Sequence, residues 1–208
     1  MCKGLTKKLV ILFFVSISFI QFGCSGLYDA IVNIQRLQFK LDRVTGMSVA
    51  GVGFSNIASL SNLGLVDAAN LLANFSQGKL PVNFTLNVLA KNPNDGTGGT
   101  KNTSAVIKNL AWRLFLDDKE TINGNIGGIT VPGVGQATNI PIGMSLDLIQ
   151  FFKNTGYESL MNLALALGGK NGSAARVTLK ATPTVSTALG DITYPGEISI
   201  IDKEFRGQ

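Results

Sequence analysis

The side chains that most often perform chemistry are scarce in this sequence. Its 208 residues include no histidine and only two cysteines, which removes Ser-His-Asp and Cys-His arrangements and the commonest metal ligand. Asp117, Asp118 and Glu120 form the acidic cluster, and paired carboxylates can hydrolyse glycosidic bonds. These acids stand beside Lys119 between two expected strands, so we interpret them as a solvated hairpin turn.

The glycine-rich segments do not indicate a nucleotide site. Gly51-Val-Gly53 and Gly133-Val-Gly135 are too short for a dinucleotide fingerprint and lack the helix that this motif opens. Trp112 stands on an alternating strand, which favours a core position over a ligand platform. We therefore predict no catalytic residue, no metal ligand and no cofactor, and we expect that the protein is not an enzyme.

The N-terminal segment has the organisation of a secretory leader. Its basic and apolar parts follow one another in order, with Lys3, Lys7 and Lys8 before an apolar run from Leu9 to Ile20. A membrane-spanning helix needs about 20 apolar residues, and this run is shorter, so it is typical of a signal-peptide core. We predict that residues 1–23 are a lipoprotein signal peptide.

Cys24 is the residue with the clearest chemical role. Gly23-Cys24 at the end of the apolar run resembles a lipobox, the bacterial processing signal in which the cysteine is thioether-linked to diacylglycerol. Gln21 and Phe22 depart from its commonest pattern. Since Cys2 lies in the leader, Cys24 has no partner for an intrachain disulfide in the mature chain. We predict lipidation of Cys24, with several acyl chains providing stable anchoring and residues 24–33 forming the anchor and a short tether.

The expected location follows from this anchor. Ser25 and Gly26 carry no acidic retention signal, so an outer-membrane lipoprotein facing the periplasm is the expectation. Removing the three leader lysines from the 18 basic residues leaves 15 against 13 acidic residues. That weak positive charge predicts no nucleic-acid partner.

The remaining domain, residues 34–208, has mostly two-residue periodicity. Clear alternation of apolar and polar side chains, typical of half-buried antiparallel strands, occurs in Arg36–Asp42, Val82–Ala90, Leu110–Leu116, Val177–Ala181 and Ile198–Ile200. Turn signals separate these segments at Asn94-Asp95-Gly96, Asn123-Gly124, Pro132-Gly133 and Asn171-Gly172. The pattern predicts an all-β antiparallel sandwich.

Two segments have helical spacing instead. Leu60–Phe75 has Ser61 or Asn62 as a candidate cap, and Leu146–Leu167 is interrupted at Gly156 and ends at Gly168 and Gly169. We expect these helices to lie over the sandwich or to close one end of it. Their apolar side chains form ordinary core packing or, as the alternative, a groove for apolar ligands lined by Leu71, Leu72, Phe75, Leu160, Leu163, Leu165 and Leu167.

The strand Val82–Asn94, which ends in Asn92-Pro93-Asn94, resembles the signature strand of the LEA type 2 family (LEA14-like, or the water stress and hypersensitive response domain). Further segments follow in the family's order at Leu110–Leu116, Asn123–Ile129, Thr130–Pro132 and Ala137–Ile142. The resemblance covers roughly Ile34 to Asp202 and departs from the family in an insert, Ser55–Gly78. Pro93 cannot donate to a strand ladder, and asparagine side chains close turns, so we interpret the tripeptide as a structural turn.

The resemblance implies a fibronectin-like or immunoglobulin-like β-sandwich without catalytic residues, linked to dehydration and cold stress. Two hypotheses follow for this chain. In the first, it is a membrane-anchored structural, protective or interaction module that contacts envelope proteins. In the second, it binds or transfers lipids or other apolar ligands between the sandwich and its helices.

Overall fold

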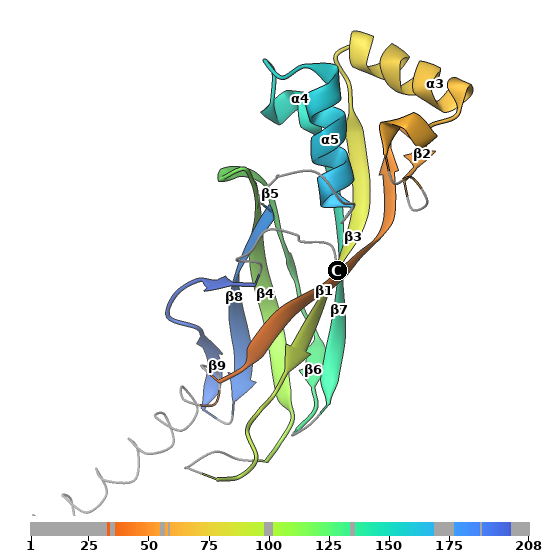
Figure 1. The fold of residues 1–208 in the computed structure, drawn as a ribbon. Coiled ribbons are helices and arrows are strands. Elements are labelled where there is room, and N and C mark those ends of the chain that lie inside the picture. Colours follow the sequence, from red (N-terminus) through yellow and green to blue (C-terminus); the bar gives the residue numbers. More distant parts are fainter. Residues whose placement is uncertain are drawn as a thin grey trace, which may run out of the picture.

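The computed structural model describes residues 33, 36–54, 57, 59–97, 102–133, 136–168, 177–187 and 189–200. These residues form an elongated sandwich of two antiparallel sheets with helices at one end (Figure 1). The predicted signal peptide and Cys24 lie outside the described residues, as do Gly169 and the Asn171-Gly172 turn. None of the described helices has the length and apolar character that a membrane span requires.

The first sheet has the strand order β2-β1-β3-β7. The second sheet has the order β10-β8-β4-β5, and in it β6 also pairs with β4 and β9 also pairs with β8. The bounds of the strands in the first sheet are β1 Gln38–Val49, β2 Val52–Gly53, β3 Pro81–Lys91 and β7 Ala137–Asp147. Those in the second sheet are β4 Ala105–Leu116, β5 Lys119–Ile126, β6 Ile129–Val131, β8 Val177–Thr187, β9 Gly190–Thr193 and β10 Ile198–Ser199. The predicted all-β sandwich is therefore confirmed.

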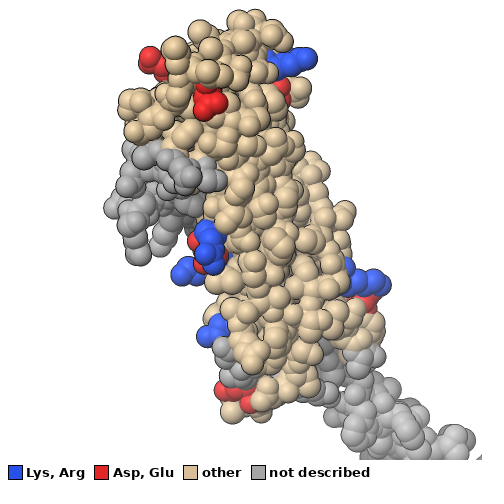
Figure 2. Space-filling view, turned by 90° about the vertical axis from the view of Figure 1, so that its right-hand side faces the viewer, with Lys and Arg blue, Asp and Glu red and all other residues tan. Residues whose placement is uncertain are grey.

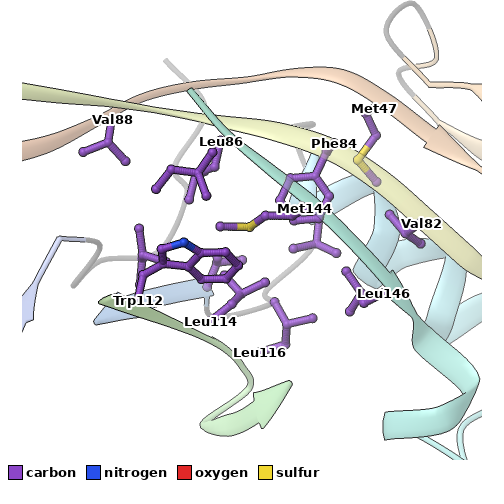
Figure 3. Close-up of a cluster of buried hydrophobic side chains, with 14 of the residues drawn as sticks. Met47, Val82, Phe84, Leu86, Val88, Trp112, Leu114, Leu116, Met144 and Leu146 are labelled. Carbon is purple, nitrogen blue, oxygen red and sulfur yellow. The ribbon is translucent and has the colours of Figure 1, made fainter. Parts of the chain in front are cut away.

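Alternation in the long strands builds the core between the sheets. Every second residue of β3 from Val82 to Ala90 is buried, and the same period buries β4 from Leu110 to Leu116. Figure 3 shows side chains of both sheets pointing into this layer, among them Phe84 and Leu86 from β3, Met144 from β7 and Trp112 from β4. The core position predicted for Trp112 is confirmed.

The Asn123-Gly124 turn prediction is wrong, because both residues lie inside β5. Gly124 faces Trp112 across the β4–β5 ladder, and a Cβ at Gly124 would lie 2.6 Å from Cζ2 of the indole. A glycine in a strand interior often marks such a close approach rather than a turn. The residues that do turn the chain here are Asp117 and Asp118, both with positive φ, which confirms the hairpin predicted for the acidic cluster.

Three helices and a 3-10 turn complete the described fold: η1 Leu60–Asn62, α3 Leu65–Ser76, α4 Leu148–Phe151 and α5 Tyr157–Leu167. Figure 1 shows them together at one end, which we call the helical end. The predicted closure of one end of the sandwich is thus confirmed. The insert that carries α3 leaves the sheet after β2 and returns at β3.

The predicted helix boundaries needed correction in two places. Helix α3 begins at Leu65 with Gly64 as its N-cap, so Ser61 and Asn62 do not cap it; they belong to the preceding 3-10 turn. Leu146 is still part of β7, and Asp147, its last residue, caps α4. The predicted break at Gly156 is confirmed, since Gly156 is the N-cap of α5 and Gly168 is its C-cap.

Candidate functional site

The Asn-Pro-Asn segment lies at the end of the sandwich opposite the helices. Gln38, the first residue of β1, pairs with Lys91, the last residue of β3, so the chain enters the domain beside this segment. Asn92 and Asn94 are only 1% and 3% exposed. A buried amide side chain is costly without hydrogen bonds, so the contacts of these two residues define what the segment does.

Both asparagine side chains form hydrogen bonds with the backbone of other segments. Asn92 Oδ1 accepts a hydrogen bond from the backbone N–H of Asn94 at 3.1 Å, across Pro93, and Asn92 Nδ2 donates to the Thr103 carbonyl at 2.9 Å. Asn94 Nδ2 donates to the Asn33 carbonyl at 3.1 Å. We call Asn33, Asn92, Asn94 and Thr103 the asparagine clasp. It joins the end of β3, the segment before β4 and the chain that leads into β1. These contacts give Asn92 and Asn94 a structural role in the fold.

Replacing Asn92 by alanine is expected to destabilise the domain by about 2 kcal/mol, because it leaves the N–H of the buried Asn94 without its acceptor and removes the hydrogen bond to the Thr103 carbonyl. A urea unfolding curve measures this loss. The matched control is Asn125→Ala in β5, where the asparagine is exposed, and its unfolding midpoint should stay at the wild-type value. Equal midpoints for the two variants would show that the clasp does not stabilise the fold.

A polar ladder on the outer face of the first sheet lies beyond the clasp. Asn87 in β3 donates through Nδ2 to Thr45 Oγ1 at 3.0 Å, and its Oδ1 accepts from Asn139 Nδ2 of β7 at 3.0 Å. These bonds cross three strands and leave Asn87 buried although its side chain points outward. The ladder stabilises strand order and offers no unpaired reactive group.

The helical end is fastened to the sheets by Asp147. Its Oδ1 accepts from the N–H of Leu80 and from the N–H of Ile149, each at 3.0 Å, and so ties the start of β3 to the start of α4. Phe75 of α3 meets Tyr157 of α5 edge to face, with ring centroids 5.3 Å apart. Burial in this contact raises the pKa of the Tyr157 phenol, which therefore stays neutral.

The residues predicted to line an apolar groove lie in two different environments, the buried core and the exposed surface. Leu71, Leu160 and Leu167 are fully buried, Leu163 and Leu165 nearly so, and they pack with side chains of both sheets in one continuous core, against which Phe75 also lies. Leu72 is 55% exposed and lies on the outer side of α3. Most of these side chains therefore pack in the core, and Leu72 lies on the surface.

A shallow hollow also lies at the helical end, beside α4. Its volume is about 350 Å³ and its lining residues are Lys119, Gln150, Phe151, Phe152, Lys153, Asn154 and Thr155. Lys119 Nζ donates to the Phe151 carbonyl and lies 5.5 Å from the centroid of the Phe152 ring. The ammonium group is therefore engaged by the wall of the hollow, and none of the predicted groove residues lines it.

Two basic side chains on the outer face of the second sheet, Lys108 and Arg113, form ion pairs. Arg113 binds Glu197 and Glu120, and hydrogen bonding to Glu197 raises the pKa of its guanidinium. Hydrogen bonds from Lys108 and Ser186 lower the pKa of Asp191. No group of three or more acidic, cysteine or histidine side chains suited to a metal ion occurs in the described residues.

Fold and clasp together define the class of the protein as an antiparallel β-sandwich with a helical end. No family model matches the chain, and no curated protein matches it. Among solved structures it resembles a protein from Archaeoglobus fulgidus, with 15% identity, a TM-score of 0.33, and coverage of 58% of this chain and 86% of that one.

Two solution structures are also similar. One is described as a candidate late embryogenesis abundant (LEA) protein, with 18% identity, a TM-score of 0.38 and coverage of 92% of this chain and 87% of that one. The other is a protein from Arabidopsis thaliana, with 20% identity, a TM-score of 0.33 and coverage of 60% and 75%. At these TM-scores the neighbours assign neither a ligand nor a partner to this chain.

Proposed function

We propose that the chain is a lipid-anchored, non-catalytic β-sandwich module of the bacterial cell envelope, with a structural, protective or interaction role. The observation that carries this proposal is the asparagine clasp. It binds the backbone at Asn33, nine residues after Cys24, to the end of β3. An anchor on Cys24 would thus attach to the domain at its clasp end.

The link to dehydration or other stress comes from the sequence resemblance to the LEA type 2 family. Its signature segment has a physical role in this fold, because Asn92 and Asn94 form the hydrogen bonds of the clasp. The function that fits best is protection or organisation of the envelope next to the outer membrane, without turnover of a substrate.

Cys24→Ser is the variant that tests the anchor. Wild-type protein is expected in the membrane fraction, with an N-terminus at Cys24 whose mass includes a diacylglyceryl group and an N-acyl chain. The Cys24→Ser variant should lose both lipid groups, because a hydroxyl cannot form the thioether. The control is Cys2→Ser, which changes only the leader and should leave processing unchanged.

Complementation tests the physiological part of the proposal. A strain that lacks the gene should survive drying less well, and the wild-type and Cys2→Ser chains should restore survival while Cys24→Ser should not. A free thiol on Cys24 in the secreted protein would contradict the anchor. Full survival of the deletion strain would contradict the protective role and leave the anchor unaffected.

A further inference from the structure

Helix α3 has an exposed apolar face at the helical end. Leu65, Val66 and Leu72 are 88%, 73% and 55% exposed, and they account for three of the five large hydrophobic side chains exposed in the described part of the chain. The exposed alanines Ala69 and Ala73 lie between them at helical spacing. We call these five residues the α3 face.

The α3 face is not the side by which the helix packs on its own domain. Leu71, which is fully buried, and the half-buried Phe75 hold α3 to the core from the other side. The one charged residue of the helix, Asp67, is half-buried and stands on that inner side too. The α3 face therefore carries no charge, and Figure 2 shows an end of the molecule that is mostly uncharged, with a few separate charged groups.

A second copy of the chain is a poor fit to the α3 face. The helix has 12 residues and is about 18 Å long. A stable protein interface buries roughly 800 Å² on each partner, more than five side chains of one short helix supply. Binding to a bilayer needs no such minimum area, because the binding strength of an interfacial helix scales with the apolar area that it buries.

The length of chain between anchor and domain allows the α3 face to reach the anchoring membrane. The clasp holds Asn33 at the clasp end, so the tether runs from Cys24 to Asn33 and can extend to roughly 30 Å at about 3.3 Å per residue. β1, which runs from the clasp end toward α3, is 12 residues long and so spans about 40 Å. The tether is therefore shorter than the sandwich, and an anchored domain brings α3 to the bilayer when its long axis lies along the membrane surface.

We infer that the α3 face inserts into the boundary between headgroups and acyl chains of the membrane that holds Cys24. This inference rests on the proposed lipid anchor. The anchor holds the domain near the bilayer, and the three protruding side chains then orient it by their apolar area. The occupant is the acyl-chain region of lipid, since the face offers no charge to a headgroup.

The test uses lipidated full-chain protein reconstituted in phosphatidylcholine vesicles. An Ala69→Cys variant carries an environment-sensitive fluorophore on α3, and an Asn123→Cys variant carries it on the exposed surface of β5. Nitroxide groups at shallow or deep positions of the acyl chains quench a fluorophore that lies near them. Because an interfacial helix is buried about 5–10 Å into this boundary, the shallow nitroxide should quench the α3 label more than the deep one.

Two substitutions identify the side chains responsible. Leu65→Gln with Leu72→Gln should abolish quenching of the α3 label, whereas Leu189→Gln, which changes a leucine 59% exposed outside the helices, should leave it intact. Circular dichroism and urea curves should match wild type, since all three leucines are exposed. Equal quenching of the α3 and β5 labels, or a signal that depends on protein density and not on lipid nitroxides, would overturn membrane insertion.

Thiol counting separates failure of this inference from failure of the anchor. The chain has only Cys2 and Cys24, so lipidated wild-type protein without its leader should take up no thiol reagent. Labelled wild type would refute the anchor itself. Unlabelled wild type with an unquenched α3 label would refute only the insertion of α3.

Discussion

Gly127→Ala is expected to destabilise the domain by about 3 kcal/mol or more, at the upper end of overpacking costs. Gly127 connects β5 to β6, and a Cβ on it would lie 2.1 Å from the carbonyl oxygen of Lys108 in β4. That oxygen cannot move aside easily, because β4 pairs with β6 on one side and with β8 on the other near this residue. Urea unfolding followed by the fluorescence of Trp112, the single tryptophan, measures the effect.

Gly143→Ala in β7 is the matched control for Gly127→Ala. A Cβ on Gly143 would meet nothing within 4 Å, and the residue is exposed in the middle of a strand. Alanine restricts the unfolded chain more than glycine does, so we expect a change within about 1 kcal/mol and of stabilising sign. If both alanine variants unfold at the wild-type midpoint, Gly127 does not lie in close contact with the Lys108 carbonyl.

The strands of the core could be predicted from the sequence because the buried apolar residues alternate from Val82 to Ala90 and from Leu110 to Leu116. In β3 and β4 the side chains that face the other sheet are apolar and most of their neighbours are polar, which is the pattern of a half-buried strand. The same rule misses the later part of β1, where the β1–β3 ladder has register shifts between Leu41 and Arg43 and between Thr45 and Ser48. A bulge changes the face of all residues that follow it.

The junction of β7 with α4 could not be predicted, because the deciding contact is distant in the chain. Leu146 fits a helical stripe as well as a strand, and Asp147 ends the strand by accepting hydrogen bonds from Ile149 and from Leu80. Leu80 stands 67 positions away. The partner of Asn94 in the clasp, Asn33, is similarly remote. Sequence indicated that the Asn-Pro-Asn segment turns the chain but could not show which backbone it holds.

The outer side of α3 shows a third limit of sequence reasoning. Apolar residues recur nearly all round this helix, so their spacing does not say which stripe faces the core. The groove prediction placed Leu71, Leu72 and Phe75 together, but successive residues of a helix point about 100° apart. The structure turns Leu71 inward and Leu72 outward. The one charged residue, Asp67, points the wrong way, because charge usually marks the solvent side of a helix and here it stands on the inner side.

Leu160→Ala distinguishes core packing from ligand binding at the helical end. Leu160 in α5 is fully buried and belongs to the core that both sheets share. Truncation of such a leucine leaves a cavity and is expected to cost about 2–5 kcal/mol. Urea unfolding of the domain without added lipid measures this loss. The matched control, Leu72→Ala, removes the same atoms from an exposed position and should change stability by less than about 0.5 kcal/mol.

The second hypothesis, a carrier of apolar ligands, makes the opposite prediction for the same pair of variants. A leucine that lines a preformed pocket would lose little stability on truncation but would reduce the amount of bound lipid. Native mass spectrometry with lipid extraction on protein purified from its own envelope measures that amount. Stoichiometric lipid in wild type that is lost in Leu160→Ala, with an unchanged unfolding midpoint, would establish the carrier. An apo mass together with strong destabilisation assigns Leu160 to the core and leaves α3, on the outside, as the apolar surface open to a membrane.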